Sequence, residues 1–197
     1  MFYDAYEKER KGKTIMTEFE RLSETKVDSK LYFDGNILHV YMDDILLPNK
    51  EKATREYIKH IGAVCVIPVT RDGNVIMERQ FRYPVNSVIS EIPAGKLDSK
   101  DEDRLEAAKR ELREETGYTA DKWVDLGEYL PAPAYSDERI SMYLATDLHK
   151  GSNDLDEDEF LDVCEIPLKE LLDDVLSGKI TDGKTQIAIL KANAYLK

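Results

Sequence analysis

The segment from residue 94 to residue 118 places the strongest constraint on how this 197-residue chain can fold. A glycine-containing turn leads into a predicted helix that runs from about Glu102 to Glu115. The helix carries an apolar stripe at helical spacing, formed by Leu105, Ala108 and Leu112. Gly117 stands where such a helix is expected to have its C-terminal cap. One face of the helix must therefore cover a core, which leaves the other face to carry chemistry.

Acidic residues on the same helix are neighbours in space. Glu111 and Glu115 are four residues apart and Glu114 is three residues from Glu111, so their carboxylates lie near one another. Carboxylates at this spacing repel each other unless a cation lies among them. Arg110 is placed to hold one carboxylate, and hard cations such as Mg²⁺ prefer oxygen ligands. Taken alone, however, the pattern is also that of an exposed acidic helix with ordinary Glu–Arg pairs.

The whole segment resembles the Nudix box, the signature of hydrolases that cleave nucleoside diphosphates linked to another group. The family pattern is Gly, five residues, Glu, seven residues, then Arg-Glu-apolar-x-Glu-Glu-x-Gly-apolar. Here Glu102 is followed after seven residues by the run from Arg110 to Tyr118, which fits without a break. Six residues rather than five separate Gly95 from Glu102, and one additional residue in a turn costs little free energy. With these positions in place, a metal site is the favoured interpretation.

The resemblance implies an α/β fold, namely an α/β/α sandwich with a mixed sheet, preceded by a small antiparallel N-terminal sheet. The residues agree with this class. Between residues 26 and 60, strand-like runs are separated by Asp34-Gly35 and Pro48-Asn49, which predicts an antiparallel meander. Residues 63–69 are apolar at successive positions and predict a central buried strand.

The expected organisation has three parts. They are an N-terminal extension (1–17), an antiparallel dimerisation and substrate-binding subdomain (18–60), and a Nudix hydrolase domain (61–197). A short helix is expected around residues 167–176, and a longer one is expected to begin near Thr181.

In the enzymes that the box resembles, its acids hold Mg²⁺, and Mn²⁺ is also possible. The resemblance implies that Glu111 and Glu115 ligate the metal with help from Glu114. The backbone carbonyl of Ala94 would add a ligand from the turn, and Lys96 would touch a phosphate. Such sites polarise the diphosphate and lower the pKa of a metal-bound water, which attacks phosphorus. Catalysis then consists mostly of placing the water against the diphosphate and neutralising the negative charge of the phosphates.

Residues outside the box are similar to the ADP-ribose pyrophosphatase branch of the family. Pro133 lies sixteen residues after Gly117, at the proline position typical of that branch. The run that contains Arg82 ahead of the box is also of its type, as is the N-terminal meander. The resemblance implies that the following residues bind substrate: Ile37, Arg55, Glu56, Arg82, Lys96, Pro133 and Glu138.

Two carboxylates outside the box are candidates for the general base. Residues 150–160 form an acidic loop between two predicted strands, and by composition alone they are a solvated charge run. In the family, a loop at this place brings a glutamate over the diphosphate. Glu157 is the candidate base and Glu159 an additional metal ligand, although either aspartate beside them could substitute. Glu138 is the rival base and is otherwise a substrate contact; spacing alone does not separate the two.

Composition restricts the partners. The net charge of −12 argues against a nucleic-acid backbone or an anionic membrane as the main partner. It leaves room for a phosphorylated small molecule, because bound metal ions invert the local field. Two cysteines in apolar runs and the absence of a long apolar segment favour the cytoplasm. The resemblance further implies a domain-swapped homodimer, in which the N-terminal contacts come from the partner subunit.

The sequence therefore predicts a Mg²⁺-dependent hydrolase that converts ADP-ribose to AMP and ribose 5-phosphate. One alternative is a pyrophosphatase for another nucleoside diphosphate sugar, such as GDP-mannose or ADP-glucose. Relatives often carry an aromatic residue where Ile37 stands, so base selectivity is open at this stage. Another alternative is a non-catalytic Nudix module that binds ADP-ribose. Such a module would be expected to lose box carboxylates, and none is lost here.

Overall fold

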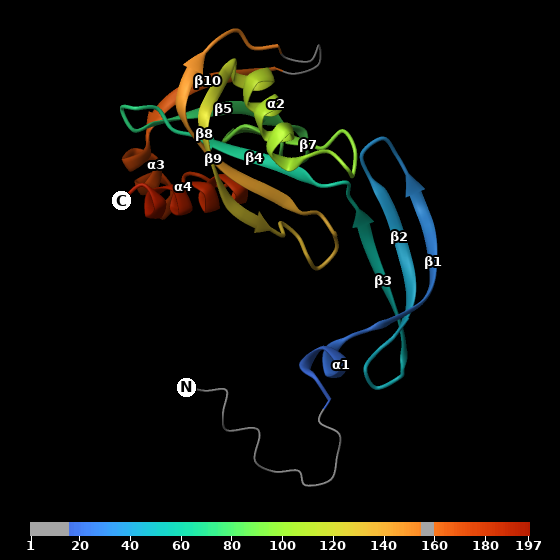
Figure 1. Cartoon of the computed structure of the whole chain (residues 1–197). Coiled ribbons are helices and arrows are strands. Elements are labelled where there is room, and N and C mark those ends of the chain that lie inside the picture. Colours follow the sequence, from blue (N-terminus) through green and yellow to red (C-terminus); the bar gives the residue numbers. More distant parts are fainter. Residues whose placement is uncertain (1–15, 155–159) are drawn as a thin grey trace, which may run out of the picture. The chain divides into compact units, whose positions relative to one another are not determined.

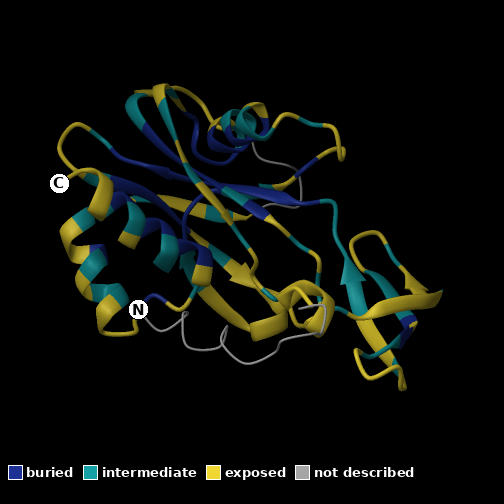
Figure 2. Cartoon of the chain, turned by 60° about the horizontal axis from the view of Figure 1, so that its bottom comes forward, coloured by how far each residue is buried: buried dark blue, intermediate teal, exposed yellow. Residues whose placement is uncertain are grey.

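The computed structural model describes residues 16–154 and 160–197. The chain divides into two compact units, one up to Ile58 and one from Lys59 onward (Figure 1). Buried residues, dark blue in Figure 2, are concentrated in the second unit. No helix in the described ranges is long and apolar enough to cross a membrane.

The first unit is a short helix followed by a three-stranded sheet of order β1-β2-β3. Its elements are α1 (Glu18–Leu22), β1 (Thr25–Asp34), β2 (His39–Leu46) and β3 (Lys52–Lys59). β1 and β2 pair antiparallel through a turn at Gly35, whose N–H donates to the Leu38 carbonyl at 2.9 Å. Buried Asp43 ties the strands together, since it accepts hydrogen bonds from Ser29 Oγ at 2.5 Å and the Tyr57 hydroxyl at 3.2 Å. The predicted N-terminal antiparallel sheet is confirmed.

The second unit contains two sheets, one of three strands and one of four. The antiparallel sheet has the order β10-β5-β6, with β5 (Asn74–Arg82), β6 (Ser87–Glu91) and β10 (Leu161–Pro167). The mixed sheet has the order β7-β4-β9-β8, with β4 (Ala63–Pro68), β7 (Ala94–Lys96), β8 (Tyr118–Tyr129) and β9 (Ile140–Lys150). Only β4 and β9 run parallel to each other. A 3₁₀ turn, η1 (Tyr83–Val85), joins β5 to β6.

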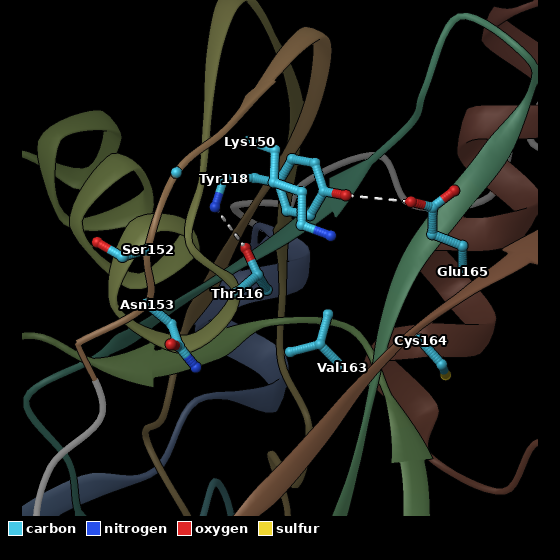
Figure 3. A pocket seen from close by; sticks show the side chains of 9 residues that line it. Thr116, Tyr118, Lys150, Ser152, Asn153, Val163, Cys164 and Glu165 are labelled. Carbon is cyan, nitrogen blue, oxygen red and sulfur yellow. Dashed lines mark hydrogen bonds between the residues drawn. The ribbon is translucent and has the colours of Figure 1, made fainter.

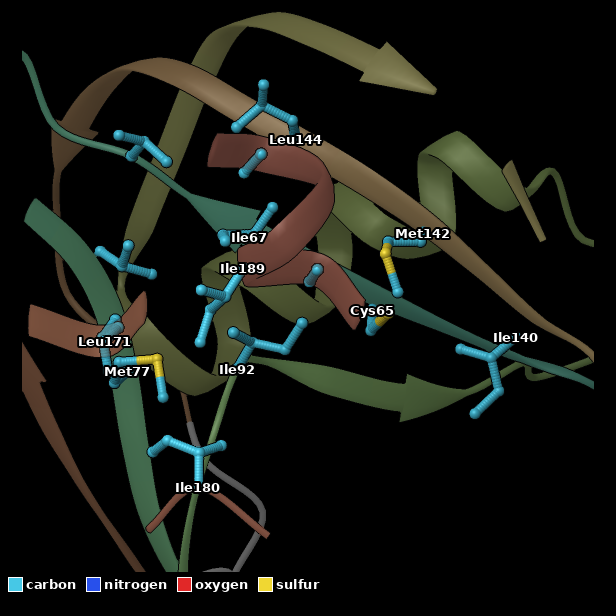
Figure 4. Packing of buried hydrophobic residues seen from close by; sticks show 14 of the residues in the cluster. Cys65, Ile67, Met77, Ile92, Ile140, Met142, Leu144, Leu171, Ile180 and Ile189 are labelled. Carbon is cyan, nitrogen blue, oxygen red and sulfur yellow. The ribbon is translucent and has the colours of Figure 1, made fainter. Parts of the chain in front are cut away.

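Strand β4 explains why residues 63–69 are continuously apolar. All six of its residues are buried, and successive side chains point to opposite faces of the sheet. Cys65 and Ile67 pack in one cluster with residues of α3 (Leu168–Leu176) and α4 (Gly183–Tyr195), as Figure 4 shows. Val64 and Val66 pack in another cluster with α2 (Arg104–Thr116). The mixed sheet is therefore covered by helices on both faces, and the predicted α/β sandwich is confirmed.

The ends of α2 are set by its caps. The helix begins at Arg104 rather than near Glu102, because the Asp103 carboxylate accepts hydrogen bonds from the N–H groups of Leu105 and Glu106. It ends at Gly117, whose φ of 75° is the left-handed conformation that glycine adopts without strain. Glu102 consequently belongs to the preceding loop.

Candidate active site in the acidic pocket beside α2

A polar pocket of about 210 Å³ lies where β7 meets α2. Its lining residues come from three segments of the chain: Ala94, Gly95, Lys96, Asp98, Arg110, Glu111, Glu114, Glu115 and Asp154. The structure therefore brings together six of the predicted site residues: Ala94, Lys96, Arg110, Glu111, Glu114 and Glu115. Asp154 is not among the site residues predicted from the sequence. In the sequence, Asp154 belongs to the acidic run at residues 150–160, and the spacing within that run does not distinguish one acid from another.

Residue 95 of the pocket is a glycine because the Glu111 carboxylate leaves no space for a side chain there. A Cβ built at residue 95 would lie 2.1 Å from Glu111 Cδ, far closer than nonbonded carbon atoms approach. The neighbouring residue Ala94 donates its backbone N–H to Glu115 Oε2 at 2.9 Å. Glu111 and Glu115 retain only 8% and 5% of their exposure. The backbone of strand β7 thus lies directly against the nearly buried carboxylates of Glu111 and Glu115.

Arg110 connects the acids of the pocket to the loop before the helix. Its Nη1 lies 2.7 Å from Glu111 Oε1 and 3.2 Å from Glu114 Oε2. Its Nε and Nη2 each lie 3.3 Å from Glu102 Oε1. Burial alone would lower the pKa of Arg110, but the charges around it, Glu111 first, raise that pKa well above its ordinary value. Arg110 therefore stays charged and orients the carboxylates.

Glu102 has a structural part in this arrangement. Its second oxygen, Oε2, accepts the backbone N–H of Asp98 at 2.7 Å, while Oε1 faces Arg110. One carboxylate thus fixes the loop after β7 to the helix that carries the pocket acids.

The donor chemistry of the pocket fits a hard divalent cation, which takes carboxylate and carbonyl oxygens. The carboxylate of Glu111 occupies the space beside Gly95, and Glu115 lines the same pocket. Within residues 16–154 and 160–197, however, no three His, Cys, Asp or Glu side chains converge as a ready-made metal cluster. Glu111 accepts a hydrogen bond from Arg110, and Glu115 accepts one from the Ala94 N–H.

Arg82 lies at the end of β5 and is held by a buried acid. Its Nε donates to Glu91 Oε1 at 2.7 Å, while 43% of the Arg82 side chain is exposed. Burial alone would lower the pKa of Arg82, but Glu91 by hydrogen bond and charge, and Glu115 by charge, raise it. The charge of Glu115, a residue of the acidic pocket, thus contributes to the raised pKa of Arg82.

Glu138 and Pro133 lie in the connection between β8 and β9 and do not line the acidic pocket. Asp137, the neighbour of Glu138, accepts the backbone N–H of His60 at 2.7 Å. Glu138 Oε1 approaches His60 Nδ1 at 3.7 Å. The same nitrogen accepts the Gly62 N–H at 3.1 Å, so Glu138 lies beside the hydrogen-bonded start of β4.

The three predicted substrate contacts in the N-terminal region belong to the first unit. Arg55 forms an ion pair with Glu24, and its Nη1 donates to the Thr54 carbonyl at 2.9 Å. Glu56 is exposed on β3, and Ile37 retains 64% of its exposure in the turn before β2. Their contact with substrate stays a prediction.

The candidate base Glu157 and the candidate ligand Glu159 lie outside the described residues. The loop that leads to them is anchored on the end of α2. The N–H of Gly151 donates to the Gly117 carbonyl at 2.7 Å, and the N–H of Asp154 donates to the Glu114 carbonyl at 2.9 Å. These bonds bring Asp154 to the rim of the acidic pocket.

A second pocket, of about 370 Å³, shares no lining residue with the acidic one (Figure 3). It lies between the end of β9 and the middle of β10, and Glu165 is the single acidic side chain that lines it. That carboxylate accepts the Tyr118 hydroxyl at 3.0 Å. The larger pocket therefore lacks the grouped carboxylates that make the smaller one a candidate active site.

Comparison with known proteins agrees with this geometry. A family model described as the NUDIX domain matches residues 59–185. An ADP-ribose pyrophosphatase of Bacillus subtilis (strain 168) is 42% identical over 85% of this chain and 91% of its own length. A methanol dehydrogenase activator of Bacillus methanolicus is 40% identical over 84% and 90% of the two chains. A GDP-mannose pyrophosphatase of Yersinia enterocolitica is 30% identical over 80% and 88%.

Among solved structures, one described as the crystal structure of an ADP compounds hydrolase has the same fold. It superposes with a TM-score of 0.77, covers 88% of this chain and 94% of its own, and is 24% identical.

Proposed function

Because the chain belongs to the Nudix family of hydrolases, we propose that it hydrolyses the diphosphate of ADP-ribose to AMP and ribose 5-phosphate. The observation that carries the proposal is the packing of Glu111 against Gly95 in a pocket with Glu114 and Glu115. The 42% identity to an ADP-ribose pyrophosphatase supports the choice of substrate.

Glu111 and Glu115 would hold a divalent cation, which we propose to be Mg²⁺ with Mn²⁺ as a substitute. The Ala94 carbonyl and Glu159 would add ligands, and Glu114 would assist. When bound, such an ion polarises the diphosphate and supplies a water of lowered pKa. The chain itself contributes the placement of the acids, since Arg110 orients Glu111 and Glu114 by hydrogen bonds.

Two cations would bind the phosphates. Lys96 lines the acidic pocket, and Arg82 feels the charge of Glu115 while part of its side chain is exposed. Pro133 would shape the pocket from the β8–β9 connection. We assign Arg55, Glu56 and Ile37 to the adenine end of the substrate.

The assignment of the adenine contacts rests on a domain-swapped homodimer, in which residues 18–60 act across subunits. Exposed apolar side chains on the first unit support such an assembly: Val27, Leu31, Tyr32, Phe33 and Ile37.

We further propose a cytoplasmic location, because Cys65 and Cys164 are free thiols. The net charge of −12 supports a small phosphorylated ligand rather than a nucleic acid.

Glu157 is the proposed general base. Asp154, three residues before it, lines the acidic pocket, which supports an approach of this loop to the reacting phosphate. Glu138 is the second candidate, although it does not line that pocket.

A second candidate function is hydrolysis of another nucleoside diphosphate sugar, supported by the 30% identity to a GDP-mannose pyrophosphatase. The deciding experiment measures nucleoside monophosphate release from ADP-ribose, ADP-glucose, GDP-mannose and ATP with Mg²⁺. A preference for ADP-ribose that chelator abolishes and added Mg²⁺ restores would support the proposal. A preference for GDP-mannose would retain the box chemistry and replace the substrate. Binding of ADP-ribose without turnover would instead favour the non-catalytic module.

A further inference from the structure

We infer that Lys184 and Glu91 are positioning residues: their buried ion pair fixes the guanidinium of Arg82 beside Glu91. The inference rests on the proposed function, in which Arg82 binds a phosphate of the substrate. It assigns a role to two residues that lie outside the Nudix box and are 93 positions apart.

Glu91 is a buried anion that uses both of its oxygens. It retains 2% of its exposure at the end of β6, just before the turn that forms the pocket. Oε1 accepts from Arg82 Nε at 2.7 Å, and Oε2 accepts from Lys184 Nζ. A buried carboxylate is costly unless it is paired, so each cation compensates a charge that the fold would otherwise exclude.

Lys184 lies in the first turn of α4, where the helix dipole disfavours a positive charge. Its presence there is explained by its surroundings rather than by the helix. Its side chain is 11% exposed and lies between Glu91 and Asp182, whose Oδ2 is 3.2 Å from Nζ.

The start of α4 is attached to β6 at a second point. Thr185 Oγ1 accepts the backbone N–H of Ile92 at 3.0 Å and donates to Asp182 Oδ2 at 2.6 Å. The start of α4 is therefore fixed against the end of β6, and the ammonium of Lys184 is held in a defined place beside Glu91.

Arg82 is the exposed member of this set, because 43% of its side chain is accessible to solvent. Among the described residues, Glu91 is the hydrogen-bond partner that the structure gives it. Because Lys184 occupies Oε2 of Glu91, Arg82 can hydrogen-bond only to Oε1. The terminal amino groups of the Arg82 guanidinium then have donors left for another ligand. Without Lys184, both oxygens of Glu91 would take Arg82 in a bidentate pair and draw it away from the substrate.

The test is a double-mutant cycle on KM with the substrate that the wild-type enzyme hydrolyses. Lys184→Met removes the charge but keeps most of the volume. Loss of a charged hydrogen bond at the phosphate predicts a rise of KM by about tenfold or more with kcat changed far less. Lys184→Arg should restore most of the affinity. Lys179→Met is the matched control, because Lys179 pairs with Asp174 at the surface and should leave KM unchanged.

The decisive arm repeats Lys184→Met in an Arg82→Lys background. If Lys184 acts through Arg82, the second substitution should add little to the rise of KM. A full and independent penalty in that background, or an unchanged KM in folded Lys184→Met, would overturn the inference. Should Lys184→Met fail to fold, Lys184→Leu carries the same prediction, because it also leaves Oε2 of Glu91 without a donor from residue 184.

A separate readout does not depend on the substrate. The Nε–H resonance of Arg82, identified by its loss in Arg82→Lys, should move in Lys184→Met and return in Lys184→Arg. An unmoved resonance contradicts the positioning role even if ADP-ribose is the substrate. If the wild-type enzyme fails to hydrolyse ADP-ribose, the proposed function fails, and a resonance that moves as described still supports the link between Lys184 and Arg82.

Discussion

The carboxylate of Glu111 fills the space that any side chain at residue 95 would need, with 2.1 Å between its Cδ and a Cβ built on Gly95. The glycine of the box is thus required by the acid on the facing helix. The two residues form one steric unit, although they are sixteen positions apart.

Gly95→Ala should therefore displace Glu111 and remove most activity. Overpacking of this kind costs about 1–3 kcal/mol of folding free energy, so thermal unfolding should shift to lower temperature without loss of the fold. Gly183→Ala is the control, because no atom lies within 4 Å of a Cβ there. Its free energy of unfolding should stay within about 1 kcal/mol of wild type. Equal turnover of both variants would contradict the steric argument.

Glu115→Gln should abolish most turnover while the fold stays intact. The amide oxygen of glutamine can still accept the Ala94 N–H, so packing is preserved, but the charge that would hold a cation is lost. We expect turnover to fall by about 100-fold or more, since even indirect metal partners cost about 10–100-fold. Glu106→Gln changes an exposed acid of the same helix and should leave turnover unchanged. Normal turnover in Glu115→Gln would refute the metal assignment.

The two candidate bases are separated by paired substitutions. Glu157→Gln should lower kcat by about 10²–10⁴-fold, the range for loss of a general base, while KM stays near that of wild type. Glu138→Gln should alter KM more than kcat if it is a substrate contact. The reverse result would make Glu138 the base.

Cys65 should resist alkylation in the folded protein at pH 8. Burial raises the pKa of this thiol from 9.0 to about 12, so the reactive thiolate is absent. Iodoacetamide labelling followed by mass measurement should modify Cys65 only after denaturant is added. Because the unfolded thiol ionises first, this group stabilises the fold below pH 9, and that contribution is lost as pH rises toward about 12. Rapid labelling of native Cys65 would show that the cluster around it opens readily.

The sequence was sufficient for features that depend on local periodicity. Spacing alone predicted that Glu111 and Glu115 share a face of one helix, and the continuous apolar run predicted β4 as a strand covered on both faces. The start of α2 was misplaced by two residues, because the apolar pattern does not reveal that Asp103 caps the helix.

Other features depend on contacts between distant segments. The ion pair of Glu91 with Lys184 joins β6 to α4, and neither residue has a neighbour in sequence that signals the other. The position of Asp154 depends in the same way on hydrogen bonds between its loop and the end of α2. Such contacts form only in the assembled fold, and no periodic pattern in the sequence predicts them.

The place of Glu102 outside α2 has a consequence for insertions and deletions in chains of this kind. Between Lys96, where β7 ends, and Glu102 the chain is a loop. One residue more or less there changes only the length of the connection to Glu102, whose carboxylate accepts a hydrogen bond from Arg110. From Arg110 to Glu115 the chain is helical, and one inserted residue would turn every later side chain by about 100° about the axis. Related sequences can therefore vary in length on the first side of Glu102, while an insertion between Arg110 and Glu115 would rotate Glu115 out of the pocket.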